Sequence, residues 1–177
     1  MRKFRLISDA DFGLEIKEMD NPTVRYAARG IVINNDKIAV LHKKNKNEYK
    51  LIGGGVEKDE LYDVAFKREV KEEAGATLKN IWLLGIIQEN RTHDNFQQIS
   101  YVYVGDVENI GETEYTDKEK DEGAEILWVS IDKALDLIKD CENEIIPSKY
   151  ENMYHSKFIV RRDYEILKYY QKMINND

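Results

Sequence analysis

Residues 54–76 read GGVEKDELYDVAFKREVKEEAGA, and the fold of the chain can be worked out from this stretch. The glycines at its start, which continue Gly53, disfavour a helix and let the backbone turn or approach a ligand closely. Apolar and long side chains then recur at helical spacing until Gly75 supplies a stop signal. The pattern predicts a helix from about Glu60 to Ala74, with Asp59 as its N-terminal cap.

Three glutamates stand close together on this predicted helix. Glu69, Glu72 and Glu73 have the spacing i, i+3 and i+4, which places their carboxylates on one side of the helix within a turn. They repel one another, and they lie where the helix dipole disfavours negative charge. Helical projection puts Glu72 on the inward-facing stripe, where it needs a partner charge. That stripe consists of Leu61, Val64, Ala65 and Arg68.

A divalent cation would explain these carboxylates. Arg68 can pair with one of them, but a single guanidinium cannot neutralise three. Magnesium prefers oxygen ligands, and the sequence has no cluster of cysteine or histidine to compete for a metal. The alternative is a solvated charged face, because Lys67 and Lys71 are interspersed. The glycines alone would more often form a plain turn, so it is their fixed distance from the glutamates that favours a phosphate site.

The stretch resembles the Nudix box, which reads G, five residues, E, seven residues and then R-E-U-x-E-E-x-G-U, with U apolar. The matching positions are Gly54, Glu60, Arg68, Glu69, Val70, Glu72, Glu73 and Gly75, and Ala76 fills the last apolar place. Ile52 stands where proline is common, Asp59 where glycine is common, and Leu61 where a small hydroxyl residue is common. None of these departures removes a carboxylate.

The resemblance implies an α/β fold, a Nudix-type α/β/α sandwich with a mixed β-sheet. It also implies that water attacks phosphorus in a nucleoside diphosphate linked to another group X, so that a P–O–P bond breaks. By analogy Glu69, Glu72 and Glu73 bind magnesium, with manganese as an alternative ion, and Arg68 belongs to the same catalytic group. One of these three glutamates is expected to assist deprotonation of the water, and Glu69 is the leading candidate. The metal would stabilise charge on the phosphoryl oxygens and lower the pKa of the water.

Sites of this family often gain a further carboxylate from a later loop. Glu122, six residues before Trp128, is the candidate metal ligand by its place in the sequence. Glu119 and Glu125 compete with it, and a solvated acid in an acidic loop is the alternative for each.

The substrate-binding candidates are the glycines Gly54 and Gly55 and the arginines Arg25 and Arg29. The arginines flank the first long strand and could hold substrate phosphates, although surface arginines on strands are more often solvated.

Aromatic residues that could stack on a base are Phe96, Tyr101 and Tyr103, for which packing within a strand is the alternative. The histidines His42, His93 and His155 are isolated in sequence, and none is marked as the partner of a nucleophile.

The remaining elements follow the order strands, helix, strands, helices, which predicts a mixed sheet between helices. A hairpin is expected to turn at residues 34–36, and residues 109–123 read as a loop. Expected strands cover 25–34, 37–41, 48–52, 81–89, 98–107 and 125–129, and expected helices cover 132–139 and about 156–174. No linker divides the chain, so residues 1–177 are expected to form a single Nudix hydrolase domain with an N-terminal strand region at about 1–20.

Composition limits the partners. The net charge of -7 is spread over 177 residues without a basic block, which argues against extended nucleic acid. No apolar run is long enough to span a bilayer, so no membrane partner is expected. Cys141 is the only cysteine, which excludes an intrachain disulfide and a thiolate zinc cage. We expect a cytoplasmic protein that takes a small nucleotide-like substrate. The sequence does not give the oligomeric state, although homodimers are common among the proteins it resembles.

The leading interpretation is therefore a magnesium-dependent pyrophosphohydrolase. Its candidate substrates are a nucleoside triphosphate, a nucleotide sugar, ADP-ribose or a dinucleoside polyphosphate, and the sequence does not select among them. The alternative is a non-catalytic nucleotide-binding or regulatory Nudix module, which is disfavoured because every carboxylate of the motif is present. A purely structural or metal-buffering protein would explain the glutamates but not the glycines.

Overall fold

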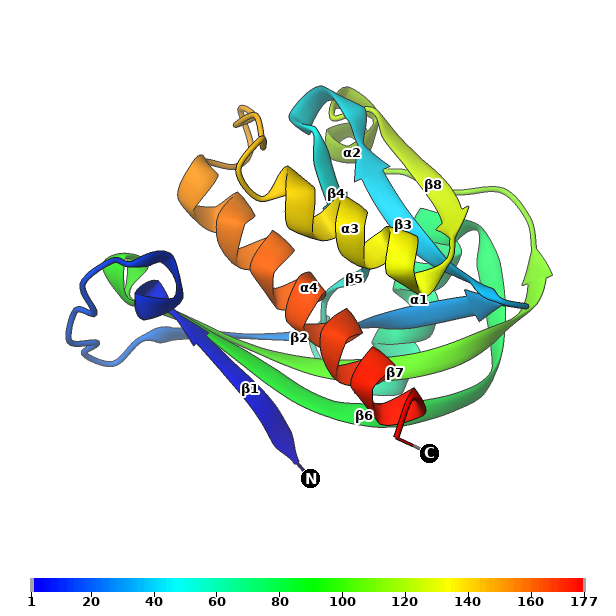
Figure 1. Cartoon of the computed structure of the whole chain (residues 1–177), viewed down its shortest axis with the longest axis horizontal. Coiled ribbons are helices and arrows are strands. Elements are labelled where there is room, and N and C mark those ends of the chain that lie inside the picture. The colour runs from blue at the N-terminus through cyan, green and yellow to red at the C-terminus, as the bar shows by residue number, and fades with distance from the viewer. Residues whose placement is uncertain (1, 177) are drawn as a thin grey trace.

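A computed structural model describes residues 2–176 and contains a mixed sheet with helices on both of its faces (Figure 1). The strands are β1 Lys3–Ser8, β2 Thr23–Asn34, β3 Lys37–Lys43, β4 Glu48–Lys50, β5 Ile52–Gly55, β6 Ala76–Arg91, β7 Phe96–Ile110 and β8 Ala124–Val129. The helices are α1 Tyr62–Ala74, α2 Asp117–Asp121, α3 Ile131–Cys141 and α4 Met153–Ile174. Short 3-10 turns lie at Asp9–Phe12, Lys44–Lys46 and Thr92–Asp94.

The sheet has the order β1-β6-β7-β2-β3-β4, with β5 paired to β2 and β8 paired to β3. It is mixed because β2 runs parallel to β7 and β1 runs parallel to β6, whereas the other pairs are antiparallel. The predicted hairpin is confirmed: Ile33 lies opposite Ile38, and Asn35 takes the left-handed conformation that a tight turn needs. The long strands β2 and β7 lie next to each other in the middle of this sheet, and residues of both strands line the site described below.

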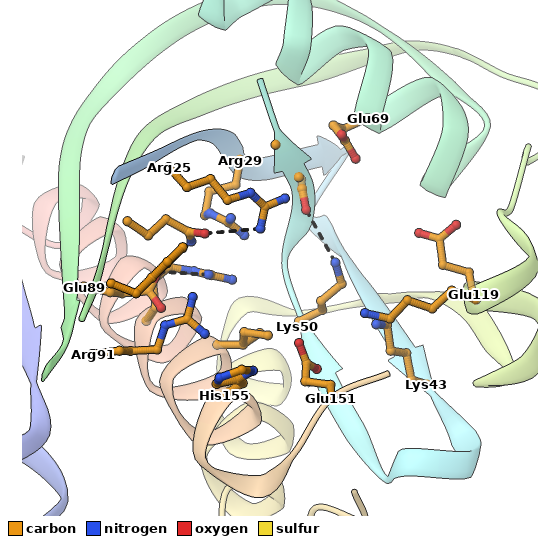
Figure 2. A pocket seen from close by; sticks show the side chains of 18 of the residues that line it. Arg25, Arg29, Lys43, Lys50, Glu69, Glu89, Arg91, Glu119, Glu151 and His155 are labelled. Atoms are coloured by element: carbon orange, nitrogen blue, oxygen red, sulfur yellow. Dashed lines mark hydrogen bonds and ion pairs between the residues drawn. The ribbon is translucent and has the colours of Figure 1, made fainter. Parts of the chain in front are cut away.

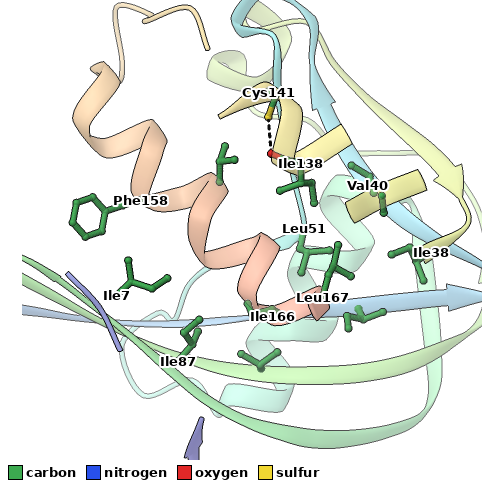
Figure 3. Packing of buried hydrophobic residues seen from close by; sticks show 14 of the residues in the cluster. Ile7, Ile38, Val40, Leu51, Ile87, Ile138, Cys141, Phe158, Ile166 and Leu167 are labelled. Atoms are coloured by element: carbon green, nitrogen blue, oxygen red, sulfur yellow. Dashed lines mark hydrogen bonds between the residues drawn. The ribbon is translucent and has the colours of Figure 1, made fainter. Parts of the chain in front are cut away.

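Apolar residues alternate along the strands and so build a core on each face of the sheet. Ile38 and Val40 of β3 face one core, whereas Ala39 and Leu41 face the other. The first core is covered by α3 and α4, and Phe158 of α4 lies fully buried in it (Figure 3). The second is covered by α1. This layering confirms the predicted α/β/α sandwich with a mixed sheet.

The buried face of α1 is not the one expected from the sequence. The residues packed into the core are Ala65, Phe66, Val70, Glu73 and Ala74. Leu61 and Val64 are exposed, and the side chain of Glu72 is 36% exposed. The prediction that Glu72 points inward was therefore wrong. The buried face of α1, which contains Phe66 and Val70, is rotated by about a third of a turn from the predicted one, so Glu73 is buried instead.

The ends of the helices also differ from the expectation. Asp59 does not cap α1: it lies in a turn with a φ of 64°, and α1 begins at Tyr62 without a side-chain cap. Gly75, with a φ of 62°, does end α1 as predicted. The C-terminal helix begins earlier than residue 156, because the side chain of Asn152 caps its first turn by accepting from the backbone N–H of His155.

Two predicted segments have more structure than the sequence indicated. The strand expected at residues 48–52 is divided at Leu51 into β4, which pairs with β3, and β5, which pairs with β2. The loop expected at residues 109–123 contains the short helix α2, which opens with a capping box between Thr116 and Glu119. No helix within residues 2–176 has the length and apolar character needed to cross a bilayer.

Candidate functional site

A cavity of about 660 Å³ opens beside the glycines of β5 (Figure 2). Of the residues predicted from the sequence, it is lined by Arg25, Arg29, Gly54, Gly55, Glu69 and Glu73. Arg68, Glu72 and Glu122 are not among its lining residues. The fold thus brings together glycines, carboxylates and arginines from β2, β5 and α1.

Gly54 allows α1 to lie directly against β5. A Cβ atom at this position would lie 2.5 Å from a carboxylate oxygen of Glu69, which is too close for any side chain. The neighbouring Gly53 has a φ of 139°, a conformation that side chains rarely adopt. The missing side chain at Gly54 therefore leaves the space that the Glu69 carboxylate occupies beside β5.

We expect Gly54→Ala to lower turnover by about 10²-fold while the fold persists. The new Cβ atom would clash with the carboxylate of Glu69, which is the mobile end of a side chain. The carboxylate would therefore be displaced, whereas the core would not. A small misplacement of a reacting group can lower the rate by about 10²-fold. Steady-state kinetics and thermal unfolding measure the two effects. Gly111→Ala is the matched control, because its Cβ would meet only the carbonyl oxygen of Gly75 at 3.6 Å. Equal kinetics for both variants would contradict this role of Gly54.

Arg68 holds the acidic groups of the motif in place. Its Nε and Nη2 donate to the two carboxylate oxygens of Glu60 at 2.9 and 3.1 Å. Its Nη1 donates to Glu69 at 2.8 Å and to Glu72 at 3.2 Å, and Nη2 also donates to the carbonyl of Gly55 at 3.0 Å. The hydrogen bonds to Glu60 raise the pKa of Arg68. Arg68 does not line the cavity, but through these bonds it links three carboxylates of the motif to the glycine strand.

Glu73 is the most buried carboxylate of the motif, with 2% of its surface exposed. The Lys50 ammonium donates to it at 3.0 Å, and the backbone N–H of Gly53 donates at 2.8 Å. Burial nevertheless raises the pKa of Glu73 to about 7, and the nearby charge of Glu69 adds to this effect. Lys50 therefore does not fully offset the cost of burying the Glu73 carboxylate, and further positive charge would stabilise its ionised form.

Of the three acids considered as the further carboxylate, Glu119 lines the cavity, whereas Glu122 and Glu125 do not. Glu119 lines the cavity, is held by the N–H and hydroxyl of Thr116, and lies close enough to Glu73 to raise its pKa. Glu122 does not line the cavity: it is buried, pairs with Lys43 at 2.7 Å and accepts from Ser148. The capping box of α2 directs the side chain of Glu119 toward the cavity. The choice of Glu122 used only its position in the sequence, which does not give the direction of a side chain on a helix.

Arg25 and Arg29 extend from β2 toward the glycines. Arg29 is 3% exposed, and its Nε donates to the hydroxyl of Ser100 at 3.0 Å. Burial lowers the pKa of Arg29 to about 10, and the positive charge of Arg162 contributes. Arg25 has Gln98 as an acceptor at 3.4 Å. Neither arginine forms an ion pair with a carboxylate of the described residues.

The opposite wall of the cavity was not foreseen from the sequence. It comes from the first turns of α4 and from the ends of β6 and β7, through residues that include Glu89, Arg91, Asn152, His155 and Arg162. Arg162 pairs with Glu89 at 3.1 Å and with Asp163 at 2.7 Å. The polar interruptions in the apolar pattern of α4 were the available signal, since Arg162 and Asp163 stand on its core-facing side.

A buried ion cluster anchors the chain just before this wall. Lys46 is fully buried, and its ammonium donates to Glu48 at 2.7 Å, to Glu151 and to the hydroxyl of Ser156 at 3.1 Å. Glu48 is fully buried as well. The cluster joins the 3-10 turn after β3 to the start of α4 and so fixes where α4 begins.

The aromatic candidates have different surroundings. Tyr101 stacks on Tyr62 with a centroid distance of 3.6 Å, and Tyr103 stacks on Phe66, so both pack against α1. Phe96 lines the cavity and carries the guanidinium of Arg91 over its ring at 4.1 Å.

The histidines are likewise separated. His155 lines the cavity and contacts Asp94 at 2.7 Å, whereas His42 contacts Glu125 and His93 contacts the carbonyl of Glu15. No nucleophile lies beside any of these pairs among the described contacts.

The chemistry of the acidic groups fits a magnesium ion. Glu69, Glu73 and Glu119 present oxygen atoms to one cavity, and oxygen is the ligand type that hard cations prefer. Within residues 2–176, no group of three or more acidic, histidine or cysteine side chains already converges at metal-ligand spacing. The carboxylates are paired with Arg68 and Lys50 instead. Glu69 and Glu73 line the cavity with these pairings in place.

Comparison with known proteins agrees with this geometry. The model of the NUDIX domain family matches residues 24–148. No curated protein matches the chain. A MutT protein from Bacillus halodurans is 25% identical, with a TM-score of 0.52 over 64% of this chain and 72% of that one.

Two further solved structures share the fold at 16% identity. A MutT NUDIX hydrolase from Burkholderia pseudomallei has a TM-score of 0.52 over 79% of this chain and 98% of its own. A NUDIX hydrolase from Nitrosomonas europaea has a TM-score of 0.54 over 80% of this chain and 93% of its own. With the family model covering most of the sequence, the chain belongs to the NUDIX family and is a hydrolase of pyrophosphate bonds.

Proposed function

We propose that the protein cleaves a nucleoside diphosphate linked to another group X, by magnesium-dependent attack of water at phosphorus. The observation that carries this proposal is the meeting of carboxylates, glycines and unpaired arginines in one cavity. An acidic protein needs local positive charge to bind a diphosphate, and Arg25 and Arg29 provide it beside the glycine strand.

Glu69, Glu72 and Glu73 are the proposed metal ligands, joined by Glu119 in place of Glu122. Their role is supported by the buried position of Glu73 and by the charge of Glu119 nearby, which raises the pKa of Glu73. When bound, magnesium or manganese would stabilise charge on the phosphoryl oxygens and lower the pKa of the attacking water. Glu69 then accepts the proton from that water, since it lines the cavity directly beside Gly54.

The phosphates are held by residues of β2 and β5. Gly54 and Gly55 let the diphosphate approach the backbone, and Arg25 and Arg29 donate to its oxygens. Lys43 and Lys50 line the same cavity and are held in place by Glu122 and Glu73. Arg68 acts behind the site by keeping Glu69 and Glu72 in position.

A substrate panel in the presence of magnesium tests the proposal. It includes nucleoside triphosphates, nucleotide sugars, ADP-ribose and dinucleoside polyphosphates, and both phosphate and nucleoside monophosphate release are scored. We expect turnover of at least one class, its loss on chelation with EDTA, and its recovery with magnesium or manganese. No turnover across the panel would overturn the proposed reaction and favour a binding or regulatory module.

A further inference from the structure

The cavity extends well beyond the glycines, to an end that we call the distal end and define by Arg91, Phe96 and His155. Arg29 of β2 lies opposite Gly53, whereas Thr23 of β2 lies opposite Phe96, which in turn lies opposite Arg91. The rise along a strand is about 3.3 Å per residue, so the row containing Arg91 is about 20 Å from the row containing Arg29. Figure 2 shows Glu69 and Glu119 on one side of the cavity and Arg91 and His155 on the other.

The guanidinium of Arg91 is held in place but is not neutralised. It lies over the ring of Phe96 at 4.1 Å, and its Nε is buried without a hydrogen-bond acceptor among the described residues. No carboxylate of those residues lies within ion-pair distance of it. Burial lowers the pKa of Arg91, because the charged form lacks a partner that offsets desolvation.

The acids that face the distal end are already engaged by other residues. Glu89 accepts from Arg162 at 3.1 Å and from Gln98 at 2.7 Å. Asp94 contacts His155 at 2.7 Å, and Glu151 pairs with buried Lys46. These acids attract Arg91 through space, but none forms a hydrogen bond with it. Arg91 therefore lacks a hydrogen-bonded acid at the distal end. Its row lies about 20 Å from that of Arg29 but only about 7 Å from that of Arg25, which is two residues from Thr23.

We propose that Arg91 forms a distal anion subsite, which binds a phosphate or carboxylate group that the substrate carries in addition to the diphosphate that is cleaved. This inference rests on the proposed function for the position of the diphosphate. Arg91 can offer a planar pair of N–H donors to such a group, and its position over the ring of Phe96 keeps the guanidinium at the distal end. A neutral sugar or base would leave the charge of Arg91 unsatisfied.

Two pairs of probes locate the extra anion. UDP-glucose and UDP-glucuronic acid differ by a carboxylate on the group X, whereas ADP-ribose and ADP-ribose 2′-phosphate differ by a phosphate on the nucleoside. We expect kcat/KM, measured with magnesium, to favour the more anionic member of at least one pair by tenfold or more, the factor that about 1.4 kcal/mol provides. The pair that shows the preference tells which end of the substrate reaches Arg91.

The variants are Arg91→Gln, Arg91→Lys and the control Lys133→Gln, which removes an exposed charge on α3. Arg91→Gln is expected to abolish the preference, Arg91→Lys to retain part of it, and Lys133→Gln to leave it unchanged. Thermal unfolding checks that each variant is folded. Parent enzyme without preference in either pair, or a preference that Arg91→Gln leaves intact, would overturn the subsite.

Binding without turnover separates this inference from the proposed reaction. Isothermal titration calorimetry of the same probes in EDTA gives the ratio of Kd values within each pair. A preference that is present in the parent and absent in Arg91→Gln supports the subsite even if no probe is hydrolysed. Failure to hydrolyse any probe would count against the proposed reaction alone. Equal Kd ratios in the parent and Arg91→Gln, together with normal hydrolysis, would reject the subsite alone.

Discussion

Glu73→Gln is expected to lower kcat/KM by about 10³-fold or more and to leave the protein folded. Glutamine has nearly the same shape and keeps an oxygen that can accept from Lys50 or from the N–H of Gly53. It removes the negative charge by which Glu73, as a proposed metal ligand, would bind a divalent cation. Steady-state kinetics with magnesium and a substrate found in the panel measure the effect.

Asp63→Asn is the matched control for this prediction. Asp63 lies on the same helix, but it is on the outer side and pairs with Lys67, with 44% of its side chain exposed. We expect its kinetics to match those of the parent. If Glu73→Gln turned over as fast as Asp63→Asn, Glu73 would have no part in the reaction.

Lys46→Met is expected to cost about 3–5 kcal/mol in the free energy of unfolding, the usual effect of breaking a buried ion cluster by removing one partner. Methionine fills most of the space but leaves the carboxylates of Glu48 and Glu151 without their shared ammonium. In a domain of this size the melting temperature would fall by roughly 10 °C. Urea unfolding, monitored by circular dichroism, gives the free energy.

Lys44→Met provides the comparison, two residues away in the same turn. Lys44 also pairs with a carboxylate, that of Glu125 at 2.7 Å, but its side chain is 55% exposed. Solvent screens such a pair, so the loss should stay at or below about 1 kcal/mol. If both variants lost similarly small amounts of unfolding free energy, the burial of Lys46 would not contribute to stability.

The sheet and the motif helix could be predicted because their signals are local. The hairpin between β2 and β3, the glycines of β5 and the helix stop at Gly75 all follow from residues adjacent in the chain. The phase of α1 could not be predicted from its own sequence. Its buried face is chosen by contact with the sheet, and Phe66 and Val70 outweighed the stripe that ran through Leu61 and Val64.

Half of the site depends on contacts between distant segments. The glycines, the glutamates of α1 and the arginines of β2 were found because the motif or the strand pattern marks them. Glu119 was ranked below Glu122 because the short helix α2, whose turn directs the two side chains apart, was read as loop. Arg91 and His155 have no local signal, since they reach the cavity only when α4 packs across the ends of β6 and β7.

A crystal structure grown with abundant magnesium and a non-hydrolysable diphosphate analogue tests the metal site most directly. The account predicts an ion in contact with Glu69 and Glu73, with Glu119 turned toward it and the analogue's phosphates beside Arg25 and Arg29. It would be contradicted by an analogue bound in the cavity while the same acids remain paired with Arg68 and Lys50 and no ion lies near them.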